Sequence, residues 1–489
     1  MALHLWQLGA RDTAARVRSG ELSARAVAES SLARVAQVNP ALNALIGVDA
    51  EWTLAQADSV DQRLKAGQDL PLAGVPVTVK DNLWVQGRRI TQGSKLFADF
   101  IAPEDAWVVS RLRALGAVMV GITNCSEFAC KGLTNNLLHG ITRSPWDPRR
   151  TPGGSSGGAV AALAAGIGAL ALGTDAGGST RRPAAHCGLV GMKPTFGVVP
   201  YGPGFEEPNF GLSVIGQLGR DVADTALMFD SLRGWEHVDW GSQPGHAQRA
   251  TDAIQRPPNR GLRIAFSMDL GCGFPIDKPV RDVIAQAIER LAADGYQIDE
   301  AAPQWPGSAR EYPLLKLQHA GLSALYGQAL AADPSRIDPD LAAQIRLGNT
   351  YTSQDIAELL LLRERIYAAY ARFFQRYDLL LCPTTPVVSW PVEQLGPPEI
   401  GGEAVGARGH AAFTPLFNYC QAPACSVPVG LAQPPDSGAS ALPPGPSTRL
   451  PVGLQIVGRR HDDALVFQMA AQFERLLGAS AHPPGWVQA

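Results

Sequence analysis

The sequence contains few cysteines and none of the short cysteine spacings that metal sites or redox motifs use. Its seven cysteines are odd in number and include no Cys-x-x-Cys pair. The nine histidines are scattered, with no two of them four residues apart. These absences exclude a disulfide framework and the usual zinc patterns. We therefore expect buried, reduced thiols, and we expect neither a metal site nor a cofactor.

The chain also lacks a long apolar run and a cluster of basic residues. Its longest apolar stretch, Ala159–Leu172, is shorter than the ~20 residues that a membrane-spanning helix needs. Met1–Arg11 contains no basic segment followed by an apolar one, so no signal peptide is predicted. The net charge is -3. We expect a cytoplasmic protein that binds neither membranes nor nucleic acid.

The remaining composition and the order of predicted elements indicate a large folded α/β protein. Of the 489 residues, 46% are hydrophobic and 18% are charged, which supplies a substantial core. Val75–Lys80 is typical of a strand, Asp105–Ala114 of a helix, and Val118–Gly121 of a second strand. This alternation predicts an α/β sheet.

The first part of the chain has a different pattern. Apolar residues after Ser23 recur at helical spacing, and Asn39-Pro40 is predicted to end that helix. We expect two parts, a helical segment over residues 1–70 packed on a core domain over residues 71–489.

A glycine- and serine-rich segment without charge stands out in the middle of the chain. No charged side chain occurs between Thr151 and Thr174, so this segment is predicted to be buried. Gly153–Gly157 fits the G-x-S-x-G pattern of a nucleophile elbow, but three prolines precede it where an elbow needs a strand. The serines therefore need another explanation.

Lys80 is a candidate catalytic base. Seven of the 42 basic residues are lysines, and this one ends an apolar strand, where burial lowers the pKa of an amine. Arginine stays protonated and cannot serve as a base, whereas lysine replaces histidine in some serine hydrolases. The alternative is a lysine whose charged end reaches solvent from the strand end.

Taken together, these segments resemble the amidase signature family over about residues 20–475. The resemblance is carried by Gly74–Pro76 with Lys80-Asp81, Gly153–Gly158, Leu172–Ser179, Cys187–Thr195 and Pro451–Gly458. It implies an α/β fold with a single large mixed, twisted β-sheet covered by helices on both faces. It also implies a variable substrate-covering region at about residues 200–400.

The resemblance assigns a role to individual residues. It implies a Ser-Ser-Lys set in which Lys80 is the base, Ser155 the bridging serine and Ser179 the nucleophile, with a cis peptide bond between Gly154 and Ser155. The remaining roles are an oxyanion hole from the backbone N–H groups of Ala176, Gly177, Gly178 and Ser179, substrate contacts from Ala129, Gly154 and Ser155, and support from Ser156, Asp175 and Arg181.

Two features depart from the family or vary within it. Arg182 stands where family members often have a neutral residue, and it either faces a substrate carboxylate or pairs within the scaffold. Tyr201–Phe210, with Phe205, Glu206, Glu207 and Phe210, either lines the entrance to the site or forms a surface loop.

Three functions remain open at this point. The first is an amidase that hydrolyses a small-molecule carboxamide to a carboxylate plus ammonia or an amine. The second is the glutaminase subunit of a tRNA-dependent amidotransferase, which shares the fold and the catalytic set. The third is a catalytically silent binding or scaffold protein, which would not need Lys80, Ser155 and Ser179 together. The sequence specifies neither the substrate nor the oligomeric state, and a homodimer is among the alternatives.

Overall fold

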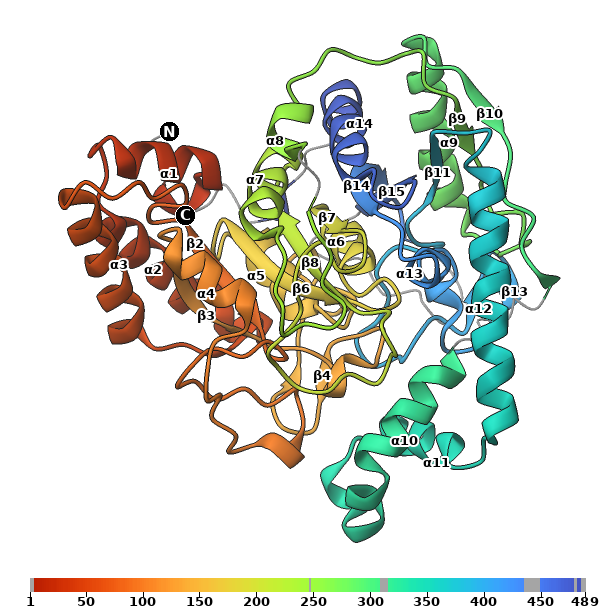
Figure 1. Ribbon diagram of the computed structural model, residues 1–489, viewed down its shortest axis with the longest axis horizontal. Helices are drawn as coiled ribbons and strands as arrows, with labels where there is room; N and C mark the ends of the chain where they lie inside the picture. Colours follow the sequence, from red (N-terminus) through yellow and green to blue (C-terminus); the bar gives the residue numbers. More distant parts are fainter. Residues whose placement is uncertain (1–3, 246–247, 308–314, 435–448, 479–481, 485–489) are drawn as a thin grey trace.

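One large β-sheet forms the centre of the protein (Figure 1). The computed structural model describes residues 4–245, 248–307, 315–434, 449–478 and 482–484. Within these ranges the main sheet has 11 strands in the order β1-β3-β2-β6-β8-β7-β14-β15-β11-β9-β10. These strands are β1 (Leu45–Gly47), β2 (Pro76–Lys80), β3 (Val118–Thr123), β6 (Leu170–Asp175), β7 (Val190–Lys193), β8 (Val214–Gly219), β9 (Ile264–Phe266), β10 (Ile298–Glu300), β11 (Leu379–Pro383), β14 (Ala424–Ala432) and β15 (Leu450–Gly458).

The sheet is mixed, as predicted. Strands β3, β2 and β6 run parallel to one another, and β11, β9 and β10 form a second parallel group. The strands between these groups, β8, β7, β14 and β15, pair antiparallel with their neighbours. Two short hairpins, β4 (Asn135–Asn136) with β5 (Gly140–Ile141) and β12 (Glu399–Ile400) with β13 (Glu403–Ala404), lie outside the main sheet.

Helices cover both faces of the sheet, which confirms the predicted α/β fold (Figure 1). Their bounds are α1 (Ala10–Arg18), α2 (Ala24–Leu42), α3 (Ala50–Lys65), α4 (Trp107–Ala114), α5 (Gly157–Ala164), α6 (Arg181–Cys187), α7 (Val222–Leu232), α8 (Ala250–Ala253), α9 (Lys278–Ala293), α10 (Leu315–Ala332), α11 (Pro339–Gly348), α12 (Ser353–Phe373), α13 (Pro415–Tyr419) and α14 (Asp463–Leu477). None of the described helices combines the length and the apolar character that crossing a membrane requires.

The helix that starts after Ser23 ends later than the sequence predicts. The Ser23 hydroxyl accepts a hydrogen bond from the Ala26 N–H, so it caps α2 as expected. Pro40 does not end the helix, and α2 continues to Leu42. Pro40 removes one helical hydrogen bond in the last turn, and Asn43 closes the helix in a left-handed conformation.

The segment around the glycine- and serine-rich motifs lies in the centre of the molecule. Every residue from 151 to 175 is buried, as the absence of charge predicts. Helix α5 in this segment contains only glycine, alanine, valine and leucine, and all of its residues are buried. Small side chains let α5 pack closely against β2 and β6, which positions the serines that precede it.

Candidate active site

The candidate site forms where β2 and β6 end. These strands are parallel neighbours with Val79 opposite Leu172, so their carboxyl ends meet at the same edge of the sheet. Lys80 is the last residue of β2, and Thr174 and Asp175 are the last residues of β6. The edge of the sheet therefore brings together side chains that are 94 residues apart in sequence.

Lys80 is fully buried and contacts two hydroxyl groups. Its Nζ lies 2.7 Å from Ser155 Oγ and 2.8 Å from Thr174 Oγ1. Burial lowers the pKa of the Lys80 amine to about 8, although negative charge at Cys125, Asp175 and Cys130 would act in the opposite direction. A substantial share of this lysine is therefore neutral at mildly alkaline pH, and the neutral amine can accept a proton from Ser155.

Ser155 lies in a tight turn just before α5. The Gly154–Ser155 peptide bond is cis, as the resemblance implies. Gly154 packs against the backbone of Leu133, where a Cβ would come within 2.6 Å of the Leu133 carbonyl carbon, so a side chain has no room. Gly154 positions the turn but does not border the open cavity. Ser156 is also behind the cavity, and its Oγ lies 3.3 Å from the carbonyl oxygen of Thr174.

The loop that carries Ser179 is held at a single peptide unit. The Gly177 carbonyl accepts hydrogen bonds from Thr414 Oγ1 at 2.7 Å and from an Arg182 guanidinium nitrogen at 2.9 Å. At the other end of the unit, the Gly178 N–H donates to Asp175 Oδ1 at 2.7 Å. Gly178 has a φ of +113°, and a Cβ there would overlap Thr414 Oγ1, so only glycine fits. The Gly178 N–H, which the resemblance assigns to the oxyanion hole, is thus engaged by Asp175.

Asp175 and Arg181 form a buried ion pair behind this loop. The two side chains are joined by hydrogen bonds of 3.0 Å and 2.9 Å. Both side chains are 0% exposed. Burial raises the pKa of Asp175, but the Arg181 charge and hydrogen bonds from Arg181 and Asn418 outweigh it and hold the pKa well below its usual range. Gln455 Oε1 accepts a further hydrogen bond from Arg181 at 2.7 Å, so the pair is anchored to β15.

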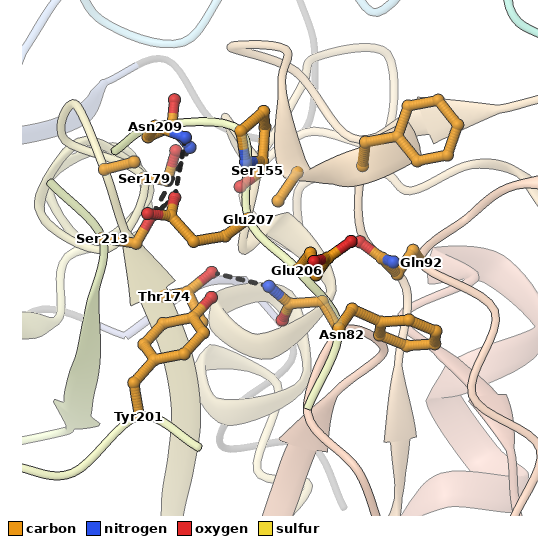
Figure 2. Close-up of a pocket in the computed structure, with 15 residues that line it drawn as sticks. Asn82, Gln92, Ser155, Thr174, Ser179, Tyr201, Glu206, Glu207, Asn209 and Ser213 are labelled. Carbon is orange, nitrogen blue, oxygen red and sulfur yellow. Dashed lines mark hydrogen bonds between the residues drawn. The ribbon is translucent and has the colours of Figure 1, made fainter. Parts of the chain in front are cut away.

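The cavity beside Ser179 consists of two hollows that share Ala129, Ala176, Ser179 and Asn209. We call the first the acidic lobe, and it is bordered by Asn82, Gln92, Tyr201, Glu206 and Glu207, together with Ser155 and Thr174 (Figure 2). Phe205 also borders it. We call the second the basic lobe, and it is bordered by Cys130, Lys131, Arg182, Leu212, Gln318 and Arg408. Ser179 lies at the junction of a negatively and a positively charged space.

One part of the segment Tyr201–Phe210 lines the site and another part lies at the surface, so each of the two alternatives that the sequence left open applies to part of it. Glu206 and Glu207 border the acidic lobe (Figure 2). Phe205 borders the same lobe. The Glu207 carboxylate accepts hydrogen bonds from the backbone N–H groups of Asn209 and Gly211 and from the Ser213 hydroxyl. Phe210 does not border the cavity, because its side chain turns outward and is 49% exposed.

Two histidines that are close in sequence to the glycine-rich segments lie away from the cavity. His186 is buried against Trp390, with ring centroids 5.4 Å apart, and burial and the charge of Arg182 lower its pKa to about 3. His139 lies 3.0 Å from Thr91 Oγ1 and does not border either lobe. All seven cysteines are free and buried, as expected. Within the described ranges, no group of three or more His, Cys, Asp or Glu side chains is arranged to hold a metal ion.

Several site residues were not identified from the sequence. Thr174 lies inside Leu172–Ser179, one of the motifs that carry the resemblance. Its position directly before Asp175 could have marked it as a site residue. Gln455 also lies in such a motif. Asn418, Gln318 and Arg408 lie in segments without a recognisable pattern, and only the fold brings them to the site.

A comparison with family models matches the family described as Amidase over residues 26–467. The chain is 35% identical over 489 residues to an acylamidase from Rhodococcus erythropolis, covering 96% of each chain. It is 34% identical over 487 residues to a glutamyl-tRNA(Gln) amidotransferase subunit from Symbiobacterium thermophilum, covering 94% of each chain. Among solved structures, 6-aminohexanoate cyclic dimer hydrolase complexed with substrate superposes with a TM-score of 0.86 at 27% identity, covering 99% of this chain and 100% of the other.

Proposed function

The chain belongs to the amidase signature family, whose enzymes hydrolyse carbon–nitrogen amide bonds, and from this premise we propose that it cleaves a small-molecule carboxamide through an acyl-enzyme on Ser179. One observation carries the proposal. The amine of Lys80, with its pKa lowered to about 8, lies 2.7 Å from Ser155 Oγ, and Ser155 borders the same cavity as Ser179.

In the first half-reaction, neutral Lys80 takes the proton of Ser155 as Ser155 takes the proton of Ser179. The Ser179 oxygen attacks the amide carbonyl carbon, and a tetrahedral oxyanion forms. When the C–N bond breaks, the proton held on Lys80 returns through Ser155 to the departing nitrogen, which leaves as ammonia or an amine. A water molecule then adds to the acyl ester, with the same lysine and serine as base, and the carboxylate product and free Ser179 are released.

The oxyanion needs fixed donors near Ser179, and three backbone N–H groups suit this role. The Gly178 N–H is held by Asp175, which leaves the N–H groups of Ala176, Gly177 and Ser179. The bond from Gly178 fixes the loop, so these donors keep their positions as charge develops. The ion pair between Asp175 and Arg181 then supports the loop and does not touch the reacting atoms.

We also assign substrate covering to the region at about residues 200–400. Its contributions to the two lobes include Tyr201, Glu207 and Gln318. These residues border the cavity beside Ser179, as those of a covering region would. Residues from 71 onward that lie outside this region supply the catalytic set, consistent with a core domain that carries the chemistry.

The proposed function is tested with the purified chain and its Ser179→Ala variant. Both are given aliphatic, aromatic and carboxylate-bearing amides and glutamine, and ammonia or amine release is followed. We expect turnover of some amides by the native chain alone. Equal turnover by Ser179→Ala would refute the acyl-enzyme on Ser179.

The glutaminase subunit of a tRNA-dependent amidotransferase is a second candidate, supported by 34% identity to an amidotransferase subunit over nearly the whole chain. It predicts strict dependence on glutamine and copurification of a partner. Turnover of non-amino-acid amides by the isolated chain would instead support the independent amidase.

A further inference from the structure

The acidic lobe contains two carboxylates and no cationic side chain. Glu206 and Glu207 border it, and no Lys or Arg is among its described lining residues. Figure 2 shows the segment that carries the two glutamates passing across the lobe. Lys80 lies behind Ser155 and Thr174, and its amine is neutral when it acts as the base. The two carboxylates therefore determine the charge of this space.

Glu207 is held in place by neutral donors. Its carboxylate accepts hydrogen bonds from two backbone N–H groups, at 2.9 Å and 3.0 Å, and from the Ser213 hydroxyl at 2.7 Å. Arg363 interacts electrostatically with Glu207, but its guanidinium donates to the carbonyl groups of Phe210 and Gly211 instead. The bonds at Glu207 fix the orientation of the carboxylate without neutralising it.

Glu206 borders the lobe and also reaches solvent. Among the described residues, no Lys, Arg or His forms an ion pair with Glu206 or Glu207. The charge of Glu206 also acts inward, on Tyr326, whose ring stacks on Phe128 at the wall of the lobe. Burial raises the pKa of Tyr326, and negative charge at Cys130 and Glu206 raises it further.

An unpaired acceptor lies in the wall of the same lobe. Asn82 is 8% exposed, and its Nδ2 donates to the Thr174 hydroxyl at 3.1 Å. Its Oδ1 is buried and accepts no hydrogen bond within the part of the chain that the structure describes. A buried oxygen without a donor costs free energy, which an N–H group of a ligand would recover.

We infer that the acidic lobe binds an ammonium group of the substrate, so that the preferred substrates are amides with a primary amine a few bonds from the scissile bond. An ammonium group combines a positive charge with three N–H donors, which match two carboxylates and the unpaired oxygen of Asn82. The rings of Phe128 and Tyr201 border the same space, and the face of an aromatic ring attracts a cation. This inference rests on the proposed amidase function.

The test compares amides that differ only in charge. In the acyl series, 5-aminopentanamide is paired with hexanamide, in which a methyl group replaces the ammonium group. In the leaving-group series, N-(4-aminobutyl)acetamide is paired with N-pentylacetamide. Shorter and longer homologues of each pair are included, and kcat/KM is measured at pH 8 and low salt from the release of ammonia or acetate.

We expect kcat/KM for the charged amide to exceed that of its neutral partner by about tenfold or more, in one series and at one chain length at least. A hydrogen bond to a charged group is worth about that factor. The series that shows the preference identifies whether the amine belongs to the acyl part or to the leaving group.

Glu206→Gln should lower this ratio by about threefold, mainly through KM, because an exposed ion pair is worth somewhat less than a buried one. Glu206→Asp keeps the charge and should retain part of the preference, which a merely structural role would not predict. Glu206→Gln/Glu207→Gln should remove most of it. Glu289, exposed on α9 and bordering neither lobe, gives the matched control, since Glu289→Gln changes the net charge as Glu206→Gln does and should leave the ratio unchanged. Thermal melting shows whether each variant is folded.

The outcomes separate the inference from the function on which it rests. Equal kcat/KM within every pair, with Ser179 still required, overturns the inference and leaves the amidase intact. A preference for the charged amide that survives in the folded double variant also overturns it.

If no amide is hydrolysed, calorimetric titration of 5-aminopentanamide and of N-(4-aminobutyl)acetamide into Ser179→Ala decides the inference. Binding that is lost in Ser179→Ala/Glu206→Gln/Glu207→Gln supports it, and equal or absent binding in both overturns it. The amidase proposal fails separately, when Ser179 also takes up no serine-directed probe.

Discussion

Lys80 Nζ and Thr174 Oγ1 lie 2.8 Å apart at the carboxyl ends of two neighbouring parallel strands. Asn82 Nδ2 also donates to the Thr174 hydroxyl, at 3.1 Å, so the hydroxyl is held from two sides. The threonine therefore orients the lysine toward Ser155. It also provides an acceptor for the charged form of the amine, which affects the pH at which the amine becomes neutral.

The first prediction concerns the pH dependence of hydrolysis. The Lys80 pKa is lowered to about 8, and the neutral form is the active base. Because the fraction of neutral amine rises with pH, kcat/KM should increase tenfold per pH unit below that value and level off above it. Initial rates between pH 6 and 10 measure this rise of kcat/KM with pH. A profile that is flat over this range would exclude Lys80 as the base.

The second prediction concerns Thr174. Thr174→Val removes an acceptor from the Lys80 ammonium, so the apparent pKa at which kcat/KM stops rising with pH should fall by about 1. The rates above that pKa should also fall about tenfold, because the amine is less well placed. Thr174→Ser retains the hydroxyl and should restore both values. If valine and threonine give the same pH profile, the hydroxyl has no role in tuning Lys80.

The third prediction concerns Asp175. From the supporting role that the resemblance implies for Asp175, Asp175→Asn would be expected to lower activity and leave the fold intact. The structure changes that expectation, because Arg181 is 0% exposed and would keep its charge without its partner. We predict a loss of about 3–5 kcal/mol in the free energy of unfolding, together with a loss of activity as the Gly178 bond is weakened. Urea unfolding measures the first effect, and an unchanged midpoint would contradict it.

The fourth prediction concerns the buried pair formed by Lys131 and Asp338. Lys131→Met leaves the Asp338 carboxylate buried without its cation, and we expect about 3–5 kcal/mol of destabilisation. The double variant Lys131→Met/Asp338→Asn removes both charges and should recover much of that loss. A double-mutant cycle by urea unfolding compares them, and additive losses would show that the two residues do not interact.

The sequence predicted the parts of this structure that depend on local pattern. The strand at Val75–Lys80 and the uncharged segment around Ser155 could be recognised, because a buried segment appears in the sequence as a run of residues that are mostly apolar or uncharged. The lowered pKa of Lys80 follows from the same burial. The resemblance to a family supplied the roles of Ser155 and Ser179, which periodicity alone does not reveal.

Features that depend on long-range contacts could not be predicted. Arg408 reaches the cavity from a segment more than 200 residues after Ser179, and nothing near it in sequence indicates that position. The bond from the Gly178 N–H to Asp175 is likewise a property of the folded loop. The end of α2 was placed too early because a proline is expected to stop a helix, whereas α2 continues past Pro40 to Leu42 before Asn43 closes it.

The most direct test of the account is to identify the residue that carries the acyl group. The native chain and Ser179→Ala are each mixed with an amide that the native chain hydrolyses, quenched in acid during turnover, digested and analysed by mass spectrometry. We predict that the native peptide containing Ser179 gains the mass of the acyl group and that the variant shows no adduct. An acyl group on another residue, or undiminished hydrolysis by Ser179→Ala, would contradict the proposed mechanism.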